Sequence, residues 1–354
     1  MLWFYYLEVD SLFEQKIGIR YVEAINFLHL HGLMKKDVFV KKAVDSGNDS
    51  YGFKEVLNVD NGYTYDVNGN MTKDLNKGIT NISYNHLNFP TRVTIGGKNI
   101  DYTYDAVGIK LSKTVSGIAT QYAGNYVYEN GVLQFFNHPE GYVLPKNASD
   151  ISQGFKYVYQ YKDHLENVRL SYTDNNNDGV ITSSTEIIEE SNYYSFGLKH
   201  KGYNNVTSSL GNSTGQKYMF NQGTSGKNFK GEEGKSFRVE RQEELGLNVD
   251  MTKFRMYDYA LGRFTSIDPL ADANPQESWT PYQYAYNSPI QYNDPYGDCP
   301  WCVWGAVIGG GLEYASQVVS NYSGGQSLTE SLTNVDGGKI AVATIAGAAT
   351  GGIG

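Results

Sequence analysis

Cysteine is scarce in this sequence of 354 residues, which contains only Cys299 and Cys302. Two cysteines cannot build a disulfide framework, and they leave the redox compartment undefined. Long apolar runs are also lacking, because no window offers about 18 uninterrupted strongly apolar residues, so no stable membrane span is expected. The opening MLWFYYLEVD has no basic region and carries Glu8 and Asp10 within its apolar run. It is therefore not predicted to be a signal peptide.

Basic residues are fewer than acidic ones. The chain has 29 basic against 38 acidic side chains, a formal charge of -9 and a pI near 5.2. Binding to phosphates requires clustered Lys and Arg, so this balance argues against nucleic acid as a partner. The simplest interpretation of the negative charge is that it keeps a large surface soluble.

Tyrosine and glycine, in contrast, are abundant, with 30 and 39 residues, while proline is limited to 9. Tyrosine favours half-buried pleated surfaces, and glycine supplies tight turns. This mixture predicts a mainly β fold, an array of short antiparallel hairpins, and argues against a helical bundle or a doubly wound enzyme. Short helices are expected at both termini, the first over residues 20–34, where apolar residues have helical spacing. We leave residues 1–50 as an unassigned helical segment.

An internal repeat begins near residue 51. Tyr63-Thr64-Tyr65-Asp66 is followed by an Asn-Gly step, and the pattern returns around Tyr84 and Tyr104 at intervals of 19 and 20 residues. Side chains two apart share one face of a strand, and Asn-Gly favours a hairpin turn. Each repeat is therefore predicted to be one hairpin, in which the Asp or Asn after the tyrosine caps turn amides and has no catalytic role. A further match at 157–165 extends the array beyond residue 150.

These repeats resemble the YD repeats of RHS proteins, large secreted β-shells that carry polymorphic toxins. Three more segments carry the same resemblance. Residues 163–169, DHLENVR, resemble the family's D-H-L-G-N-V-R, with Glu166 in place of Gly, and residues 192–197, NYYSFG, resemble its N-Y-Y-P-F-G turn. Residues 242–297 are similar throughout to the RHS repeat-associated core.

The resemblance implies a spiral of β-strands that forms a hollow shell and holds a C-terminal toxin away from its host. It divides the chain into a repeat array over 51–240, the core over 241–297 and a variable region from Asp298 to Gly354. It also implies a secreted or cell-surface protein whose partners are the toxin domain, an immunity protein or delivery machinery. The array is too short to close, so an open shell with exposed edge strands is expected.

The variable region has small and apolar residues at helical spacing and few charges. Two packed helices are expected, similar to the linkers that precede the toxin in such proteins. The sequence ends on the apolar run KIAVATIAGAATGGIG, which would need a covering layer. We therefore expect the toxin to be absent or truncated in this chain.

Two Asp-Pro steps in the core suggest a catalytic site. In some RHS proteins and insecticidal toxin-complex C-components, the aspartates of two D-P-x-G motifs and an arginine form an aspartyl autoprotease that cuts just after the second motif. The matching residues here are Asp268, Asp294 and Arg263. Two adjacent carboxylates cannot both ionise easily, so one keeps a proton while the other activates water. The chain departs from the pattern at Ala271 and Asp298, and both Asp-Pro steps could simply form turns.

Two further binding hypotheses remain open. Asp174, Asn176 and Asp178 have the spacing of the first ligands of a calcium loop, with Gly179 at its sixth position, although Thr185 stands where the closing Glu is required. A plain Asx-rich turn explains this segment equally. Trp279 and Tyr282 could stack on sugars as part of a carbohydrate-binding face, or they could belong to the core.

Overall fold

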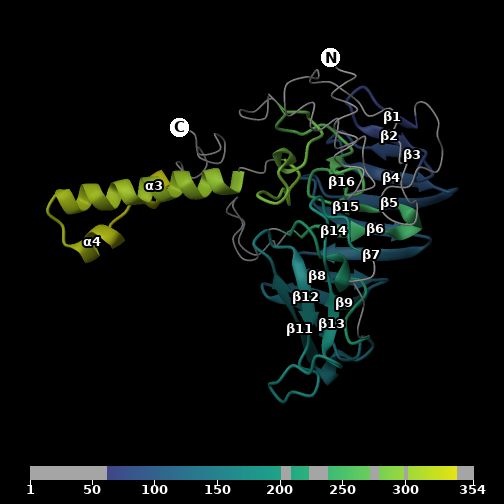
Figure 1. Ribbon diagram of the computed structural model, residues 1–354, viewed down its shortest axis with the longest axis horizontal. Coiled ribbons are helices and arrows are strands. Elements are labelled where there is room, and N and C mark those ends of the chain that lie inside the picture. Colours follow the sequence, from purple (N-terminus) through teal and green to yellow (C-terminus); the bar gives the residue numbers. More distant parts are fainter. Residues whose placement is uncertain (1–61, 201–208, 223–237, 272–278, 299–301, 341–354) are drawn as a thin grey trace, which may run out of the picture.

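The computed structural model describes residues 62–200, 209–222, 238–271, 279–298 and 302–340 (Figure 1). The expected helix over 20–34 lies outside these residues. The first thirteen strands are β1 (Tyr63–Tyr65), β2 (Met71–Asp74), β3 (Ile79–Tyr84), β4 (Pro90–Ile95), β5 (Lys98–Tyr104), β6 (Lys110–Val115), β7 (Ile118–Ala123), β8 (Tyr126–Glu129), β9 (Val132–His138), β10 (Gly141–Pro145), β11 (Phe155–Lys162), β12 (Val168–Tyr172) and β13 (Ile187–Glu190). They are followed by β14 (Glu240–Gln242), β15 (Val249–Met251), β16 (Met256–Asp258), β17 (Arg263–Phe264), α3 (Cys302–Ser323) and α4 (Leu328–Thr333).

The fold is mainly β, as the composition predicts. Strands β1 to β13 form one antiparallel sheet in which the strand order equals the chain order. Each strand pairs with the next one in the chain, so the array is a succession of hairpins (Figure 1). The sheet is open, because β1 and β13 are not paired with each other. The match at 157–165 lies in β11 and the turn after it, which confirms that the array continues past residue 150.

One turn geometry recurs through the array. At Asp66 the side-chain Oδ1 accepts hydrogen bonds from the amides of Asn68 and Asn70, at 2.9 and 2.8 Å. Equivalent pairs of bonds, to the amides two and four residues further on, are made by Asn85, Asp105 and Asp163. These carboxylates and amides therefore hold the hairpin turns, as the repeat predicts.

The repeat tyrosines join each hairpin to an earlier one. Tyr84 donates its hydroxyl hydrogen to the carbonyl of Met71 at 2.6 Å, and Tyr104 donates to Pro90 at 3.0 Å. Both carbonyls lie five residues after the turn-capping residue of the preceding repeat. Tyr193 makes the same kind of bond to Val168, again five residues after a capping Asp. The tyrosine thus contributes both apolar area and a hydrogen bond between repeats.

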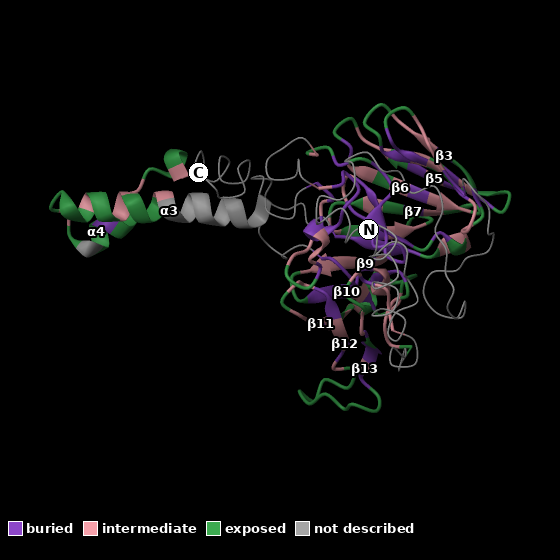
Figure 2. Cartoon of the chain, turned by 45° about the horizontal axis from the view of Figure 1, so that its top comes forward, coloured by how far each residue is buried: buried purple, intermediate pink, exposed green. Residues whose placement is uncertain are grey.

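The segment after the repeats packs onto the array. Strands β14 to β17 form a four-stranded sheet, whose Val249, Met251 and Met256 share a core cluster with Ile82 and Ile100 of the large sheet. A second cluster contains Tyr63, Met71 and Val168 together with Tyr257 and Phe264. Residues from both ends of the large sheet therefore meet around the small one. Figure 2 shows the buried positions concentrated within this two-sheet body.

A helical hairpin follows the body. Helix α4 begins with a capping box formed by Ser327 and Glu330, and it packs on α3 through a hydrogen bond from the Tyr314 hydroxyl to the Leu332 carbonyl at 3.0 Å. Both helices extend away from the sheets in Figure 1, and the part of them whose burial is described is mostly exposed (Figure 2). Helix α3 thus confirms the first of the two expected helices, whereas the apolar run KIAVATIAGAATGGIG at 339–354 lies almost entirely outside the described residues. Within the described part of the chain, no helix has the length and apolar character needed to cross a membrane.

Candidate functional site

The two Asp-Pro steps meet at one buried arginine. Arg255 lies in the turn before β16, and its Nη2 is 2.7 Å from Asp268 Oδ2 and 3.3 Å from Asp294 Oδ2. All three side chains are almost completely buried, and the guanidinium carbon of Arg255 lies 3.6 Å from the centroid of the Phe264 ring. The structure thus places both predicted aspartates at one charged centre inside the protein.

The arginine of this centre is Arg255, not the predicted Arg263. Arg263 lies in β17 with its guanidinium 5.2 Å from the centroid of the Tyr282 ring, and its Nη1 is buried without a hydrogen-bond partner. Among the described residues, no ion pair joins Arg263 to either aspartate. Both arginines belong to the core segment, and each has an aromatic residue within two positions after it, so the sequence offers nothing that separates them. Only the position of the turn before β16 against the second Asp-Pro step identifies Arg255.

Asp294 is held in place by an asparagine from a distant part of the chain. The Asn221 Nδ2 donates to the Asp294 carbonyl at 2.7 Å, and the Asp294 amide donates to Asn221 Oδ1 at 2.9 Å. Asn221 is fully buried and has a positive φ of 55°. No sequence pattern identified Asn221 as a site residue. Its two hydrogen bonds fix the backbone at the second motif.

The peptide bond between Gly297 and Asp298 lies against the charged centre. The Gly297 carbonyl accepts a hydrogen bond from Arg255 Nε at 2.5 Å, while the Asp298 amide donates to Asp294 Oδ1 at 3.2 Å. Both atoms of this peptide group are therefore in contact with members of the site. Gly297 has a φ of +78°, and a Cβ there would lie 2.2 Å from Thr252 Oγ1, so this position requires glycine.

The first motif has a different geometry at its last position. Ala271 stands where the pattern has glycine, and its amide donates to the Asp268 carbonyl at 3.0 Å to close the turn. Ala271 is absent from the described residues with positive φ. Its backbone conformation therefore suits an L-residue with a side chain, and the replacement of glycine leaves Asp268 in position.

Burial changes the acidity of both aspartates. Desolvation raises the pKa of Asp268 to about 6, although Arg255 and the Leu270 amide oppose this shift. Desolvation raises the pKa of Asp294 further, to about 7, with Arg255 opposing the shift and the negative charge of Asp268 adding to it. At neutral pH the pair can therefore hold one proton, which is the protonation state that a two-carboxylate mechanism requires.

The predicted calcium residues lie in the connection between β12 and β13. Asp174 accepts hydrogen bonds from the amides of Asp178 and Gly179, and Asn176 donates to Asp178 Oδ2 at 2.8 Å. Glu186 accepts from the amides of Asn175 and Thr182, at 2.7 and 2.8 Å. Many side-chain oxygens of this loop thus accept hydrogen bonds from the loop's own amides. The described residues contain no group of three or more His, Cys, Asp or Glu placed for a metal ion. Calcium binding stays a prediction.

The two residues considered for sugar stacking are buried to different extents. Tyr282 is buried and donates its hydroxyl hydrogen to the Gly69 carbonyl at 2.7 Å. Trp279 is half-buried, with its ring centroid 5.7 Å from that of Tyr286. Tyr282 therefore belongs to the core, which is one of the two alternatives left open for it, and it cannot face a carbohydrate in this fold.

Comparison with known proteins gives one curated sequence match and several structural ones. No family model matches the chain. The tRNA3(Ser)-specific nuclease WapA of Bacillus spizizenii is 27% identical over 259 residues, which cover 69% of this chain and 9% of that protein. The chain is thus similar to a small part of a much longer nuclease.

Two solved structures are similar over about the same share of the chain. The crystal structure of TcdB2-TccC3-TEV has a TM-score of 0.45 and 18% identity, covering 66% of this chain and 11% of that one. A Tc holotoxin pore of Photorhabdus luminescens has a TM-score of 0.44 and 16% identity, covering 67% and 11%. These scores are too low to carry an argument about function.

Proposed function

We propose that this chain is part of the β-shell and core of an RHS-type polymorphic toxin, whose work is to contain and deliver a polypeptide attached after the core. The proposal is supported by the repeat tyrosines and their turns, and by the similarity to 9% of a much longer nuclease. The nuclease activity of that relative belongs to a much longer protein and is not part of this proposal.

The observation that carries the proposal is the change in structure around Asp298. The described residues up to Gly297 belong to the two-sheet body, with the second Asp-Pro motif buried against Arg255. From residue 302 it forms α3, which extends away from that body (Figure 1). A carrier of variable cargo would have a folded body followed by a separate segment of this kind.

Containment can be tested with a protease-sensitive peptide. The same unfolded peptide, with one trypsin site, is appended after Gly354 in one protein and before Met1 in the other. Containment predicts at least tenfold slower cleavage of the C-terminal peptide than of the N-terminal one. Equal cleavage rates, with the body itself intact on the gel, would reject containment by this part of the shell.

The same proposal places the protein outside the cell that makes it. We therefore expect protein expressed in its native host to be found in the medium or to be reached by antibody on intact cells. An immunity protein or delivery machinery would be recovered with it by affinity purification from that host. Retention of all the protein inside intact cells would contradict an external location.

Self-cleavage after Gly297 is a second candidate function, and the contacts of the Gly297–Asp298 peptide bond favour it. Ionised Asp268 would take a proton from water, whose oxygen attacks the Gly297 carbonyl carbon. Arg255 Nε, which already donates to that carbonyl oxygen, would stabilise the developing negative charge. Protonated Asp294 would donate its proton to the departing amide nitrogen of Asp298. The carbon–nitrogen bond breaks, and the products are a Gly297 carboxylate and a new amino terminus at Asp298.

Mass spectrometry of the purified chain tests this candidate. Cleavage yields a fragment that begins at Asp298, and Asp294→Asn or Asp268→Asn should abolish it. Asp105→Asn is the matched control, because Asn85 fills the equivalent turn position in the array. A chain that stays intact for days between pH 5 and pH 8 would reject self-cleavage and leave the containment test unaffected.

A further inference from the structure

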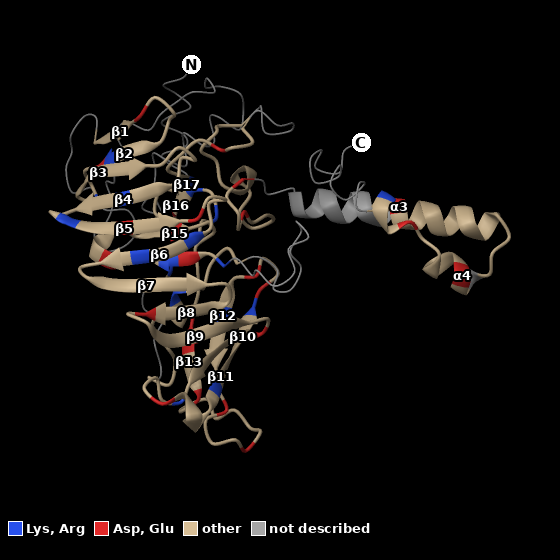
Figure 3. Ribbon diagram, turned by 180° about the vertical axis from the view of Figure 1, so that it is seen from behind, with Lys and Arg blue, Asp and Glu red and all other residues tan. Residues whose placement is uncertain are grey.

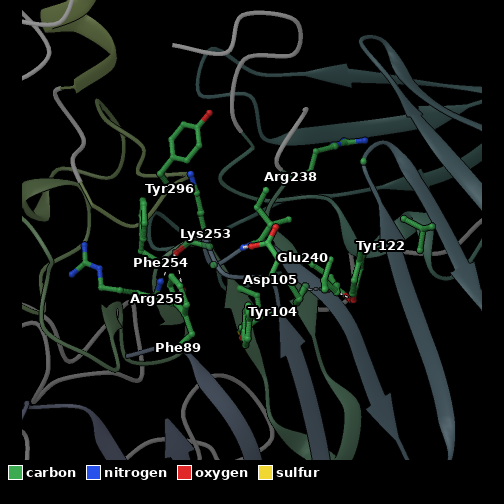
Figure 4. Close-up of a pocket in the computed structure, with 18 of the residues that line it drawn as sticks. Phe89, Tyr104, Asp105, Tyr122, Arg238, Glu240, Lys253, Phe254, Arg255 and Tyr296 are labelled. Carbon is green, nitrogen blue, oxygen red and sulfur yellow. Dashed lines mark hydrogen bonds and ion pairs between the residues drawn. The ribbon is translucent and has the colours of Figure 1, made fainter. Parts of the chain in front are cut away.

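A cavity of about 390 Å³ opens between the large sheet and the turn before β16 (Figure 4). Strands β6 and β7 form one side of it, and residues 251–255 and Tyr296 form the other. Its volume falls in the range typical of small-molecule sites. The cavity shares Arg255 with the charged centre described above, but the aspartates of that centre do not line it.

One end of the cavity is aromatic. The Phe89 ring is stacked on Tyr104, with centroids 5.2 Å apart and planes at 26°, and it is stacked on Phe254 at 6.2 Å and 24°. Lys253 Nζ lies 5.0 Å from the centroid of Phe254 and 5.8 Å from that of Tyr296. Figure 4 shows these rings on the side of the cavity away from Tyr122. This end suits a flat apolar group.

The opposite end holds a carboxylate whose acceptors are already used. Glu240 Oε2 accepts from Lys110 at 2.6 Å, from the Tyr122 hydroxyl at 2.7 Å and from Gln242 at 3.2 Å. Its Oε1 accepts from Lys113 at 2.6 Å. A cationic ligand would therefore gain little from Glu240, because the lysines already neutralise it.

Positive charge is in excess around this end. Three carboxylates, those of Asp105, Glu240 and Glu244, lie at or beside the cavity with four basic side chains, which are Lys110, Lys113, Lys217 and Arg238. Figure 3 shows acidic and basic residues close together beside β6. Arg238 is buried, and its recorded bonds go to neutral oxygens, among them Gln160 Oε1 at 2.9 Å and Asn137 Oδ1 at 2.9 Å. No carboxylate of the described residues forms an ion pair with Arg238. A buried charge of this kind favours an anion nearby.

Lys110 is the residue best placed to meet that anion. It lines the cavity, and its ammonium lies 4.4 Å from the centroid of the Tyr122 ring. An ammonium group has three donors, and one of them goes to Glu240, so further donors remain for a ligand.

We propose that this cavity binds a small aromatic carboxylate, with its ring beside Phe89, Phe254 and Tyr296 and its carboxylate toward Lys110. A peptide whose last residue is phenylalanine also carries an aromatic ring next to a free carboxylate. Neither ligand depends on self-cleavage or on containment of a cargo. The site is therefore separate from the function proposed above.

The experiment is a calorimetric titration of the full chain with 2-naphthoate, with neutral 2-naphthylmethanol and with cationic 2-naphthylmethylamine. Saturable binding of 2-naphthoate, at least tenfold tighter than that of the other two probes, is expected. A tripeptide ending in a free Phe carboxylate, compared with its amide, shows whether a peptide end is accepted as well. Equal binding of the three naphthyl probes, or no saturable binding of 2-naphthoate, would overturn the proposal.

Variants locate the binding. Lys110→Met should weaken 2-naphthoate at least tenfold and leave 2-naphthylmethanol within about twofold, whereas Lys98→Met, an exposed lysine in β5, should change neither. Ala123→Trp, at an exposed wall position, should block both probes. If Lys110→Met proves unfolded by circular dichroism, Lys110→Gln takes its place, with the same loss of 2-naphthoate affinity expected. Unchanged affinity in a folded variant of Lys110 would overturn the assignment.

Discussion

Arg255 and Gly297 are joined by a hydrogen bond of 2.5 Å from the guanidinium Nε to the carbonyl oxygen, although 42 residues separate them. This bond fixes the end of the core segment against the turn before β16. The remaining guanidinium nitrogens contact the carbonyl of Pro281 and the carboxylates of Asp268 and Asp294. One side chain thus ties together three chain segments, and its contribution to stability should be correspondingly large.

Replacing Arg255 by Gln should destabilise the protein strongly. The substitution leaves two buried carboxylates without their counter-charge, which typically costs about 3–5 kcal/mol. Urea unfolding followed by tryptophan fluorescence measures the change. The control is Arg92→Gln, because Arg92 pairs with Asp101 at the surface, where side chains are 52% and 39% exposed, and such pairs are worth about 0.2–1 kcal/mol. A loss of equal size in the two variants would contradict the structural role of Arg255.

The pH dependence of stability should change when Asp294 becomes Asn. A folded pKa of about 7, above the unfolded value, means that the folded state binds the extra proton between about pH 4 and pH 7. This contribution is present at low pH and is lost as the pH rises through 7. Asparagine cannot ionise, so Asp294→Asn should gain stability relative to the parent protein between pH 5 and pH 8, by roughly 2–4 kcal/mol.

Unfolding curves of both proteins at pH 5, 6, 7 and 8 give the difference directly. Asp105→Asn serves as the control, because Asp105 caps a hairpin turn outside the charged centre. A difference that stays constant with pH for Asp294→Asn would mean that this carboxyl is ionised at all four pH values.

The sequence predicted the hairpin array well because its determinants are local. A tyrosine, a capping Asp or Asn and a turn lie within about eight residues, and the capping side chain accepts hydrogen bonds from turn amides of its own repeat. The charged centre was predicted only in part. Asp268 and Asp294 were visible because proline follows each of them, whereas Arg255 and Asn221 act through contacts with residues 13 to 73 positions away. Local patterns contain no information on such distant pairings.

Buried Tyr282 illustrates the same limit. Its neighbours in sequence are aromatic and polar, which fits an exposed binding face as well as a core. Its burial follows from a contact with Gly69, 213 residues earlier, where a Cβ would come within 2.7 Å of the tyrosine hydroxyl. The packing of the core segment against the first hairpin decides the environment of this residue, and that packing is a tertiary property.

The hydrogen bond between repeats can be measured with Tyr84→Phe. The variant keeps the ring but loses the bond to the Met71 carbonyl, so a cost of about 1 kcal/mol is expected. Tyr161→Phe is the matched control, because Tyr161 is 66% exposed on the array and should change stability by less than about 0.5 kcal/mol. If the two variants were equally stable, the tyrosine would contribute to the repeat through its ring alone.

Glu166 offers a test in the opposite direction, where a substitution should stabilise the protein. It occupies the turn position at which the other hairpins have Gly69, Asn88 and Gly108, and its φ is 62°. A side-chain-bearing residue in this left-handed region is strained by about 1 kcal/mol or more, and glycine relieves the strain. The ion pair of Glu166 with Lys162, at 3.4 Å, is partly exposed and offsets little of this. Glu166→Gly should therefore raise the free energy of unfolding by about 0.5–1 kcal/mol, measured by urea unfolding.

Gly108→Ala at the equivalent position should lower it by more, because a Cβ there would lie 2.2 Å from the Phe89 ring. A destabilised Glu166→Gly protein would show that the ion pair outweighs the backbone strain.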